Sequence, residues 1–222
     1  MKILNYGSIN MDLVFSVPHI VVPGETISSA AMQRSAGGKG ANQSVAIAKA
    51  GISVHHAGVV GSDGKWLVSL LHSYGVDTTF IGEYEGPTGQ AFIQLSDQGQ
   101  NSIVLFPGGN NQILRSSIDA TLEHFGAGDV VLLQNEINEI PYLMEQAHRK
   151  GMSIWFNPAP ISEEVSSYPL SLVSVIVVNE IEGMALSRLS EGVSYHQILD
   201  SLVSLYPKSE IILTVGKDGA WY

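Results

Sequence analysis

Five short apolar segments with the length of β-strands are each followed by glycine or by side chains with charged or hydrogen-bonding groups. These polar ends are Gly7-Ser8-Ile9-Asn10-Met11-Asp12, Asn135-Glu136, Asn157-Pro158-Ala159-Pro160, Asn179-Glu180 with Glu182, and Gly216-Lys217-Asp218-Gly219. In an open parallel sheet, ligands bind just beyond the carboxyl ends of the strands. Because those ends meet at one edge of the sheet, we expect these groups to form a single site.

The most specific motif is the glycine-rich stretch Ala36–Gln43, at the start of an expected helix. Its glycines allow a ligand to approach the backbone, and the helix N-terminus offers unpaired N–H donors. It is not a P-loop, because Gln33 occupies the first glycine position and Gly40 follows Lys39 where Ser or Thr is required. No G-x-G-x-x-G fingerprint follows the first strand. Such a helix start is often only a turn, but Lys39 and Asn42 in its first turn favour a binding site.

Three side chains around this edge suit a polyol ligand: Asp12, Asn42 and Glu136. A carboxylate accepts hydrogen bonds from two neighbouring hydroxyls, and an amide both donates and accepts. The alternative is structural: Asp12 is then a turn residue, and Glu136 is a charge at a helix N-terminus.

Short β-branched runs alternate with amphipathic stretches, as in α/β domains with a largely parallel sheet. The expected strands are Lys2–Tyr6, Val54–Val60, Val130–Gln134, Ser153–Phe156, Val175–Val178 and Glu210–Val215. The expected helices are Gly40–Ala50, Gly64–Tyr74, Arg115–His124, Pro141–Lys150, Glu180–Leu189 and Tyr195–Tyr206, with Gly51 and Gly151 as left-handed caps. Several strands are apolar on both faces. The sequence therefore predicts one doubly wound α/β domain over residues 1–222, with helices on both faces of a mostly parallel sheet.

Two stretches depart from this alternation. Leu13–Met32 and Gln90–Phe106 show period-two patterning, with proline and glycine instead of helices between them, and Gln98–Gly99 is a plausible hairpin turn. We interpret residues 13–32 and 90–106 as a small β-layer that projects from the main sheet. The alternative is a pair of edge hairpins within that sheet.

Composition excludes several classes of function. The 222 residues include 21 acidic and 11 basic side chains, for a net charge of -10, and no cysteine. A disulfide scaffold, a zinc ribbon and thiol catalysis are therefore excluded, and an acidic chain does not suit a nucleic-acid partner. No apolar run reaches the length of a membrane span, and we expect a cytoplasmic protein. His55 and His56 point to opposite faces of a strand, so we expect no shared metal site.

Several motifs, in this order, resemble those of the ribokinase/PfkB family of sugar kinases, and most of all its ribokinase branch. They are Asn10 and Asp12 within Gly-Ser-Ile-Asn-Met-Asp, Pro23-Gly24-Glu25-Thr26, the block Gly37–Gln43, Asn157-Pro158-Ala159-Pro160 and Asn179-Glu180-Ile181-Glu182. The likeness covers Met1 to Tyr222, and Gly-Gly-Lys-Gly-Ala-Asn-Gln is its most specific piece.

The resemblance implies ATP-dependent transfer of the γ-phosphoryl group to a sugar hydroxymethyl, D-ribose above all, with Mg²⁺ and in some members K⁺. It implies sugar binding by Asn10, Asp12, Gly38, Lys39, Asn42 and Glu136. It implies nucleotide binding by Asn179, Thr214, Gly216 and Gly219, and a water-mediated metal contact by Glu182. The projecting strands resemble a lid that pairs two subunits into a homodimer. The alternatives are a kinase for another pentose, deoxyribose or a nucleoside, and a catalytically inactive sugar-binding relative.

The catalytic base of the family is an Asp in a Gly-Ala-Gly-Asp motif that opens a helix. Gly126-Ala127-Gly128-Asp129 has these letters but runs directly into the expected strand Val130–Gln134 and precedes the Asn-x-x-Glu motif. We therefore expect Asp129 to be a turn residue remote from the site. The resemblance places the base after Tyr222, so we expect these residues to hold much of a sugar site without the group that activates the hydroxyl.

Overall fold

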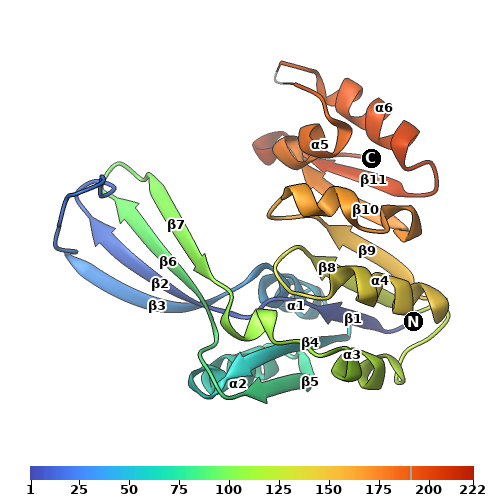
Figure 1. Ribbon diagram of the computed structural model, residues 1–222, viewed down its shortest axis with the longest axis horizontal. Helices are drawn as coiled ribbons and strands as arrows, with labels where there is room; N and C mark the ends of the chain where they lie inside the picture. The colour runs from blue at the N-terminus through green and yellow to red at the C-terminus, as the bar shows by residue number, and fades with distance from the viewer. Residues whose placement is uncertain (191) are drawn as a thin grey trace.

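The computed structural model describes residues 1–190 and 192–222, and these residues form two β-sheets (Figure 1). The main sheet has eight strands in the order β12-β11-β10-β9-β8-β1-β4-β5. All neighbouring strands in it are parallel except the β11–β12 pair. The smaller sheet has the order β3-β2-β6-β7. The predicted α/β architecture with a mostly parallel sheet is confirmed.

The main-sheet strands match the predicted ones closely, with one addition. They are β1 Ile3–Tyr6, β4 Val54–Gly61, β5 Asp77–Tyr84, β8 Val130–Gln134, β9 Ser153–Asn157, β10 Val175–Asn179, β11 Glu210–Thr214 and β12 Ala220–Trp221. The sequence did not indicate β5, whereas a strand after the turn Gly216–Gly219 was expected at Trp221-Tyr222 and is present as β12. As an edge strand, β5 is only half-buried and mixes polar with apolar residues, so it has no continuous apolar run. β12 contains only two residues, both exposed.

The six α-helices of the described residues also lie where the sequence placed them. They are α1 Lys39–Lys49, α2 Lys65–Ser73, α3 Arg115–Leu122, α4 Ile140–Arg149, α5 Glu180–Ser187 and α6 Tyr195–Leu205. Gly51 and Gly151 follow α1 and α4 with φ of 81° and 73°, which confirms the predicted left-handed caps. Short 3₁₀ turns occupy η1 Ser62–Gly64, η2 Gly108–Asn111, η3 Glu163–Ser167, η4 Leu170–Leu172 and η5 Gly216–Asp218. Within residues 1–190 and 192–222, every helix is too short or too polar to cross a membrane.

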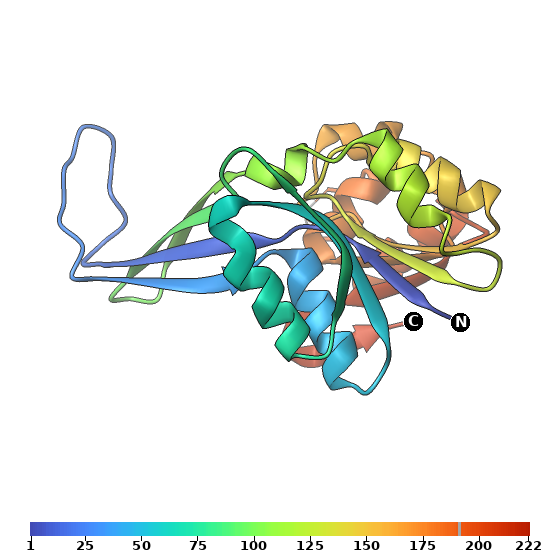
Figure 2. The same ribbon diagram turned by 90° about the horizontal axis from the view of Figure 1, so that it is seen from below.

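The helices form two layers, one on each face of the main sheet (Figure 2). Helices α1 and α2 pack on a core that includes Ile3, Val54 and Val130. The four helices α3–α6 pack on the opposite face, where Leu133, Phe156 and other alternate strand residues are fully buried. Each strand thus turns alternate side chains to the two layers, which confirms the doubly wound arrangement.

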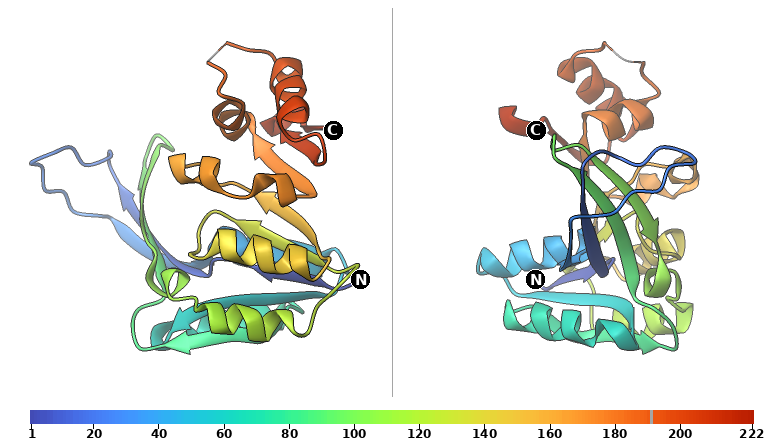
Figure 3. Two further views of the ribbon diagram at one scale, coloured as in Figure 1. Left: turned by 45° about the vertical axis from the view of Figure 1, so that its right-hand side comes forward. Right: turned by 90° about the vertical axis from the view of Figure 1, so that its left-hand side faces the viewer.

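The smaller sheet, β2 Asn10–Val17, β3 Ala31–Gly37, β6 Gly89–Ser96 and β7 Asn101–Phe106, extends away from the main sheet (Figure 3). We call it the projecting sheet. The interpretation as a separate layer is confirmed, and the alternative of edge hairpins in the main sheet is wrong. The strand bounds differ from the expected ones, because residues 18–30 form a loop and the strands instead include Asn10–Asp12 and residues 33–37. Pro18 and Pro23 lack the N–H that pairing requires. The predicted turn between β6 and β7 is present, with Gly99 at φ 77°.

Candidate functional site

The glycines of the motif Ala36–Gln43 allow α1 to begin directly against the turn that joins β1 to β2. A Cβ on Gly38 would lie 2.8 Å from the Ser8 carbonyl oxygen, and one on Gly40 would lie 2.5 Å from the Ser8 nitrogen. Gly38 also has φ of 93°, which disfavours other residues. The Ala41 amide donates to the Ser8 carbonyl at 2.9 Å. The motif therefore packs its backbone closely against the β1–β2 turn, and this contact fixes the position of the helix N-terminus.

Glu136, which follows β8, is held at this N-terminus by three hydrogen bonds. Its Oε1 accepts from the Lys39 ammonium at 2.8 Å, and its Oε2 accepts from the Lys39 backbone N–H at 2.9 Å and from the Ser8 hydroxyl. The Glu136 side chain is only 7% exposed, whereas that of Lys39 is 40% exposed. Glu136 thus does stabilise a helix N-terminus, but that of α1, 97 residues earlier in the chain.

Asp12 lies within strand β2, at the base of the projecting sheet, and not in a turn. Its carboxylate lies so close to Gly37 on β3 that a Cβ there would overlap it. Burial raises the pKa of the Asp12 carboxyl, and the Glu136 charge raises this pKa further, while Lys39 lowers it. The projecting sheet therefore carries an acidic group to the start of α1.

Asn10 is held by a residue that the sequence did not indicate. Asn110, in η2, donates from Nδ2 to the Asn10 Oδ1 at 2.7 Å, and its Oδ1 accepts from the Ile9 amide at 3.0 Å. Both asparagines are buried, with exposures of 5% and 2%. The only signal in the sequence is the stretch Pro107-Gly108-Gly109-Asn110-Asn111 after the second half of the projecting sheet.

Two clefts adjoin the Lys39–Glu136 pair. A cavity of about 300 Å³ has Glu136 in its lining, together with Asn10, Asn110 and Phe106. A second cavity of about 530 Å³ has Lys39 in its lining, together with Asn42, Asn157, Asn179, Glu182 and Thr214. Because Lys39 and Glu136 are bonded to each other, both cavities adjoin the same ion pair. Most of the predicted site residues therefore line one of the two cavities beside the Lys39–Glu136 pair.

The Asn-x-x-Glu motif forms a capping box at the start of α5. The Asn179 Oδ1 accepts from the Glu182 amide at 2.8 Å, and the Glu182 carboxylate accepts from Asn179 N and Nδ2 at 2.9 and 3.0 Å. This reciprocal arrangement satisfies the helix start. Each carboxylate oxygen has two lone pairs, so Glu182 retains acceptor capacity for a water molecule. The donor set therefore fits a metal contact through water.

Thr214 lies beside the capping box, because β11 pairs with β10 so that Thr214 is opposite Asn179. Its hydroxyl donates to the Val178 carbonyl at 3.3 Å. Gly216 and Gly219 follow, with φ of 58° and 94°, in the exposed turn from β11 to β12. A Cβ on either glycine would meet no atom within 4 Å. These glycines thus shape an open turn and are not required by packing.

Asp129 lies at the amino end of β8, whereas Glu136 follows the carboxyl end of the same strand. The Lys2 amide donates to its Oδ1 at 2.7 Å, and the Gly126 amide donates to its Oδ2 at 3.1 Å. The hydrogen bond from Lys2 is the main reason why the pKa of Asp129 is lowered. Asp129 therefore closes a turn at the end of the sheet opposite the two clefts.

The adjacent histidines lie on opposite faces of β4. His56 is fully buried, with Nδ1 2.8 Å from the Ser44 hydroxyl and Nε2 3.2 Å from the Gly7 carbonyl. Burial lowers the pKa of His56 to about 4. His55 instead contacts the Phe125 ring on the other face. Within the described residues, no three His, Asp or Glu side chains are grouped as metal ligands.

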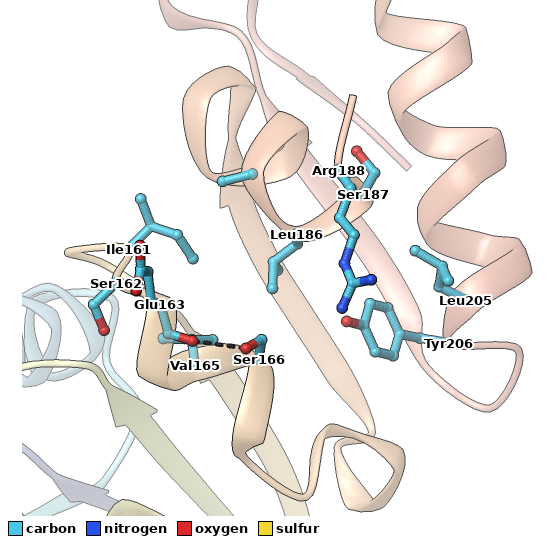
Figure 4. Close-up of a pocket in the computed structure, with 11 residues that line it drawn as sticks. Ile161, Ser162, Glu163, Val165, Ser166, Leu186, Ser187, Arg188, Leu205 and Tyr206 are labelled. Atoms are coloured by element: carbon cyan, nitrogen blue, oxygen red, sulfur yellow. Dashed lines mark hydrogen bonds between the residues drawn. The ribbon is translucent and has the colours of Figure 1, made fainter. Parts of the chain in front are cut away.

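A third cavity, of about 840 Å³, lies outside this region (Figure 4). It lies between η3 and the ends of α5 and α6, with Arg188 and Tyr206 on one wall and Ser166 on the other. None of the predicted site residues contributes to it.

The chain belongs to the pfkB carbohydrate kinase family, whose model matches residues 1–222. It is 37% identical over 186 residues to the ribokinase of Haemophilus influenzae, a match that covers 82% of this chain and 60% of that protein. It is 30% identical over 230 residues to the ribokinase of Staphylococcus aureus, covering 100% of this chain and 75% of the relative. A deoxyribokinase of Salmonella typhi is also 30% identical, over 227 residues, covering 99% and 74%. The chain thus spans 60 to 75% of the length of these relatives.

Solved structures of ribokinases have the same fold as this chain. The ribokinase of Cryptococcus neoformans in complex with ADP superposes with a TM-score of 0.84 at 31% identity, covering 99% of this chain and 74% of that one. The ribokinase of Arabidopsis thaliana complexed with ribose and ATP gives a TM-score of 0.81 at 26% identity, covering 99% and 73%.

Proposed function

We propose that the protein is an ATP-dependent sugar kinase that transfers the γ-phosphoryl group to the hydroxymethyl group of D-ribose. The observation that carries the proposal is the Lys39–Glu136 pair, which adjoins both a cleft with hydroxyl-binding groups and a cleft with the Asn-x-x-Glu motif. Phosphoryl transfer requires acceptor and donor to be held in line, with the developing charge stabilised. Two cavities on one ion pair support the proposal, because they offer neighbouring places for an acceptor and a donor.

For the sugar, the carboxylate of Asp12 and the amides of Asn10, which lines the first cavity, and Asn42, which lines the second, are proposed to bind hydroxyls. Glu136 and Lys39 are proposed to bind sugar oxygens with the hydrogen-bonding capacity that their mutual contacts leave. Gly38, whose missing side chain leaves space for the Ser8 and Asn10 backbone, is proposed to contact the sugar through its own backbone.

On the nucleotide side, Asn179, Thr214, Gly216 and Gly219 are proposed to bind ATP. Glu182 is proposed to hold Mg²⁺ through water, and the ion when bound supplies positive charge that neutralises the phosphate oxygens. The group that deprotonates the sugar hydroxyl is left unassigned, and so are ligands for K⁺. Asp129 is not proposed for that role, since it lies at the opposite end of β8.

D-Ribose is favoured because the ribokinase of Haemophilus influenzae is 37% identical to the chain, against 30% for the Salmonella deoxyribokinase. Deoxyribose is the second candidate, because that deoxyribokinase matches 99% of the chain. The two sugars differ in one hydroxyl, and a site built to bind that hydroxyl rejects the analogue that lacks it.

A homodimer through the projecting sheet is also proposed. Strand β7 exposes four consecutive apolar side chains, Ile103, Val104, Leu105 and Phe106, and Phe92 on β6 is exposed as well. An exposed apolar strand at a sheet edge favours association.

An ADP-release assay on the full-length protein tests the proposal, with ribose, deoxyribose, other pentoses and nucleosides as acceptors. We expect turnover to be highest with ribose. Turnover with deoxyribose alone would favour the second candidate. Sugar binding without ADP release would instead support an inactive sugar-binding protein.

A further inference from the structure

A row of four side-chain amides runs beneath α1 to the second cavity: Asn5 and Gln134 are fully buried, and Gln43 and Asn157 line that cavity. We propose that Gln43, on α1, is a positioning residue that couples sugar binding at the start of this helix to the placement of Glu182. The inference rests on the proposed function. Gln43 is the residue after Asn42, and its side chain lies at the centre of the row.

The first half of the row ties α1 to the main sheet. The Asn5 Nδ2 donates to the Gly40 carbonyl at 2.8 Å and to the Ser44 hydroxyl at 2.9 Å. The Gln134 Nε2 then donates both to the Asn5 Oδ1 at 2.9 Å and to the Gln43 Oε1 at 2.7 Å. These distances are those of well-formed hydrogen bonds. The acceptor end of the Gln43 amide is therefore fixed.

The second half of the row reaches the Asn-x-x-Glu motif. The Gln43 Nε2 faces the Asn157 Oδ1 at 3.5 Å. Asn157 in turn donates from Nδ2 to the Val177 carbonyl at 2.9 Å and faces the Glu182 Oε2 at 3.5 Å. Both 3.5 Å contacts are at the upper limit for a hydrogen bond. A displacement of α1 by a few tenths of an ångström relative to β9 would make or break the first contact, and the second reaches Glu182 on α5 through the same Asn157 side chain.

The orientation of every amide in the row follows from its two ends. The Gly40 and Val177 carbonyls only accept, so the Nδ2 groups of Asn5 and Asn157 must point to them. Both Oδ1 atoms then face inward, and the amides between them are oriented in turn. The row therefore has one arrangement, and its effect on Glu182 is through position and not through net charge.

Core packing does not require this polar row. Gln134 is fully buried, and its Oε1 has no hydrogen-bond partner among the described residues. An apolar side chain at this position would avoid the cost of burying an unpaired acceptor. On the same strand and face, Leu132 is apolar. A role in holding the Gln43 side chain in place would explain why a glutamine and not an apolar residue stands at position 134.

Two substitutions test the contact that Gln43 Nε2 makes with the Asn157 Oδ1, and one of them keeps the hydrogen bond that Gln43 accepts from Gln134. Gln43→Glu keeps an acceptor for Gln134 but turns an acceptor toward the Asn157 Oδ1. Gln43→Met removes both links without adding charge, and it serves if the first variant is unstable. Gln146→Leu on α4 is the matched control, because Gln146 lies on a helix on the opposite face of the sheet.

The measurement is the Kd of Mg·ADP, by calorimetry, with and without saturating ribose in the full-length protein. We expect ribose to tighten Mg·ADP binding in the wild type and in Gln146→Leu. In both Gln43 variants we expect this enhancement to fall about fivefold, which corresponds to the loss of one neutral hydrogen bond. The Kd of ribose alone should stay within about twofold.

The outcomes distinguish the inference from the proposed function. If the wild type binds neither ribose nor Mg·ADP, the proposed function fails, and the role of Gln43 fails with it. If the wild type binds both but the Gln43 variants keep the full enhancement, only the inference is overturned. An enhancement absent from the wild type also overturns it, while an equal loss of ribose affinity and enhancement would show a merely structural role.

Discussion

The two clefts differ in how the chain holds their polar groups. On the proposed sugar side, Glu136 is buried and bonded to Lys39 and Ser8, which precede it by 97 and 128 residues. On the nucleotide side, the Asn179–Glu182 box is local, and Gly216 and Gly219 lie in an exposed turn. Long-range contacts make the sugar side part of the core. The polar groups of the first cleft are thus held by contacts between distant segments of the chain, whereas those of the second are held mainly by contacts within a few residues.

The largest expected effect is on the free energy of unfolding, when one glycine beside each cleft is replaced by alanine. Gly40→Ala forces a Cβ into three backbone atoms at 2.5–2.7 Å, so we expect the free energy of unfolding to fall by more than about 3 kcal/mol. Gly216→Ala meets no atom within 4 Å, and its left-handed φ should cost about 1 kcal/mol. Urea denaturation measures both. Equal losses would contradict the contrast between the two sides.

A second effect of nearly that size depends on pH. His56 lies beneath the β1–β2 turn, and burial lowers its pKa to about 4, against about 6.5 in the unfolded chain. Because the unfolded chain binds the proton more tightly, stability is full above pH 6.5 and is lost as the pH falls toward 4. We expect a loss of about 3 kcal/mol at pH 4 from this group.

Urea midpoints between pH 7.5 and 4 test this expectation, with His56→Gln as the comparison. The variant should be less stable at neutral pH, because its amide replaces a fitted ring, but it should lose less stability on acidification. An identical pH dependence in wild type and variant would assign the acid sensitivity to other groups.

A third, smaller effect concerns ligand affinity. Asp12→Ala should weaken ribose binding by about 2 kcal/mol, the magnitude of a hydrogen bond to a charged group. The fall should be roughly 30-fold, as 1.4 kcal/mol is a factor of ten. Calorimetry on the full-length protein measures it, with Asp97→Ala, in the distant turn between β6 and β7, as control. An unchanged affinity would remove Asp12 from the sugar-binding set.

The smallest effect is expected at Asp129. Asp129→Asn should leave turnover within about twofold of wild type, because this side chain closes a turn at the other end of β8. The ADP-release assay decides. A loss of turnover with unchanged stability would show that Asp129 takes part in catalysis. The active site could then not lie at the carboxyl ends of the strands.

The sequence predicted what depends on local pattern. The apolar run Val130–Gln134 forms β8 with the same bounds, because a buried parallel strand is apolar on both faces. The Gly-rich start of α1 was also identified, because few other sequences permit so close an approach. The half-polar edge strand Asp77–Tyr84 was missed, since burial on one side leaves no continuous run.

The amide row could not be predicted, for a different physical reason. Asn5 and Gln134 are 129 residues apart, and Gln43 and Asn157 are 114 apart. Gln43 and Asn157 lie in motifs that the sequence analysis identified, but nothing in those motifs indicates that the two side chains face each other or that Asn5 and Gln134 join them. Their meaning depends on which strands are neighbours in the sheet and on which face each side chain lies, and both follow only from the assembled fold. The same holds for Asn110, which acts on Asn10 from 100 residues away.

Strand β2 begins only three residues after β1 ends, and it carries Asn10 and Asp12 at its root. Its eight residues make an arm about 26 Å long. If the tip of that arm were pushed sideways by 3 Å, a rigid strand would tilt by about 7°, and Asp12 would shift by about 0.8 Å. A rigid projecting sheet would therefore transmit a displacement of its far end to Asp12, the carboxylate that is proposed to bind the sugar.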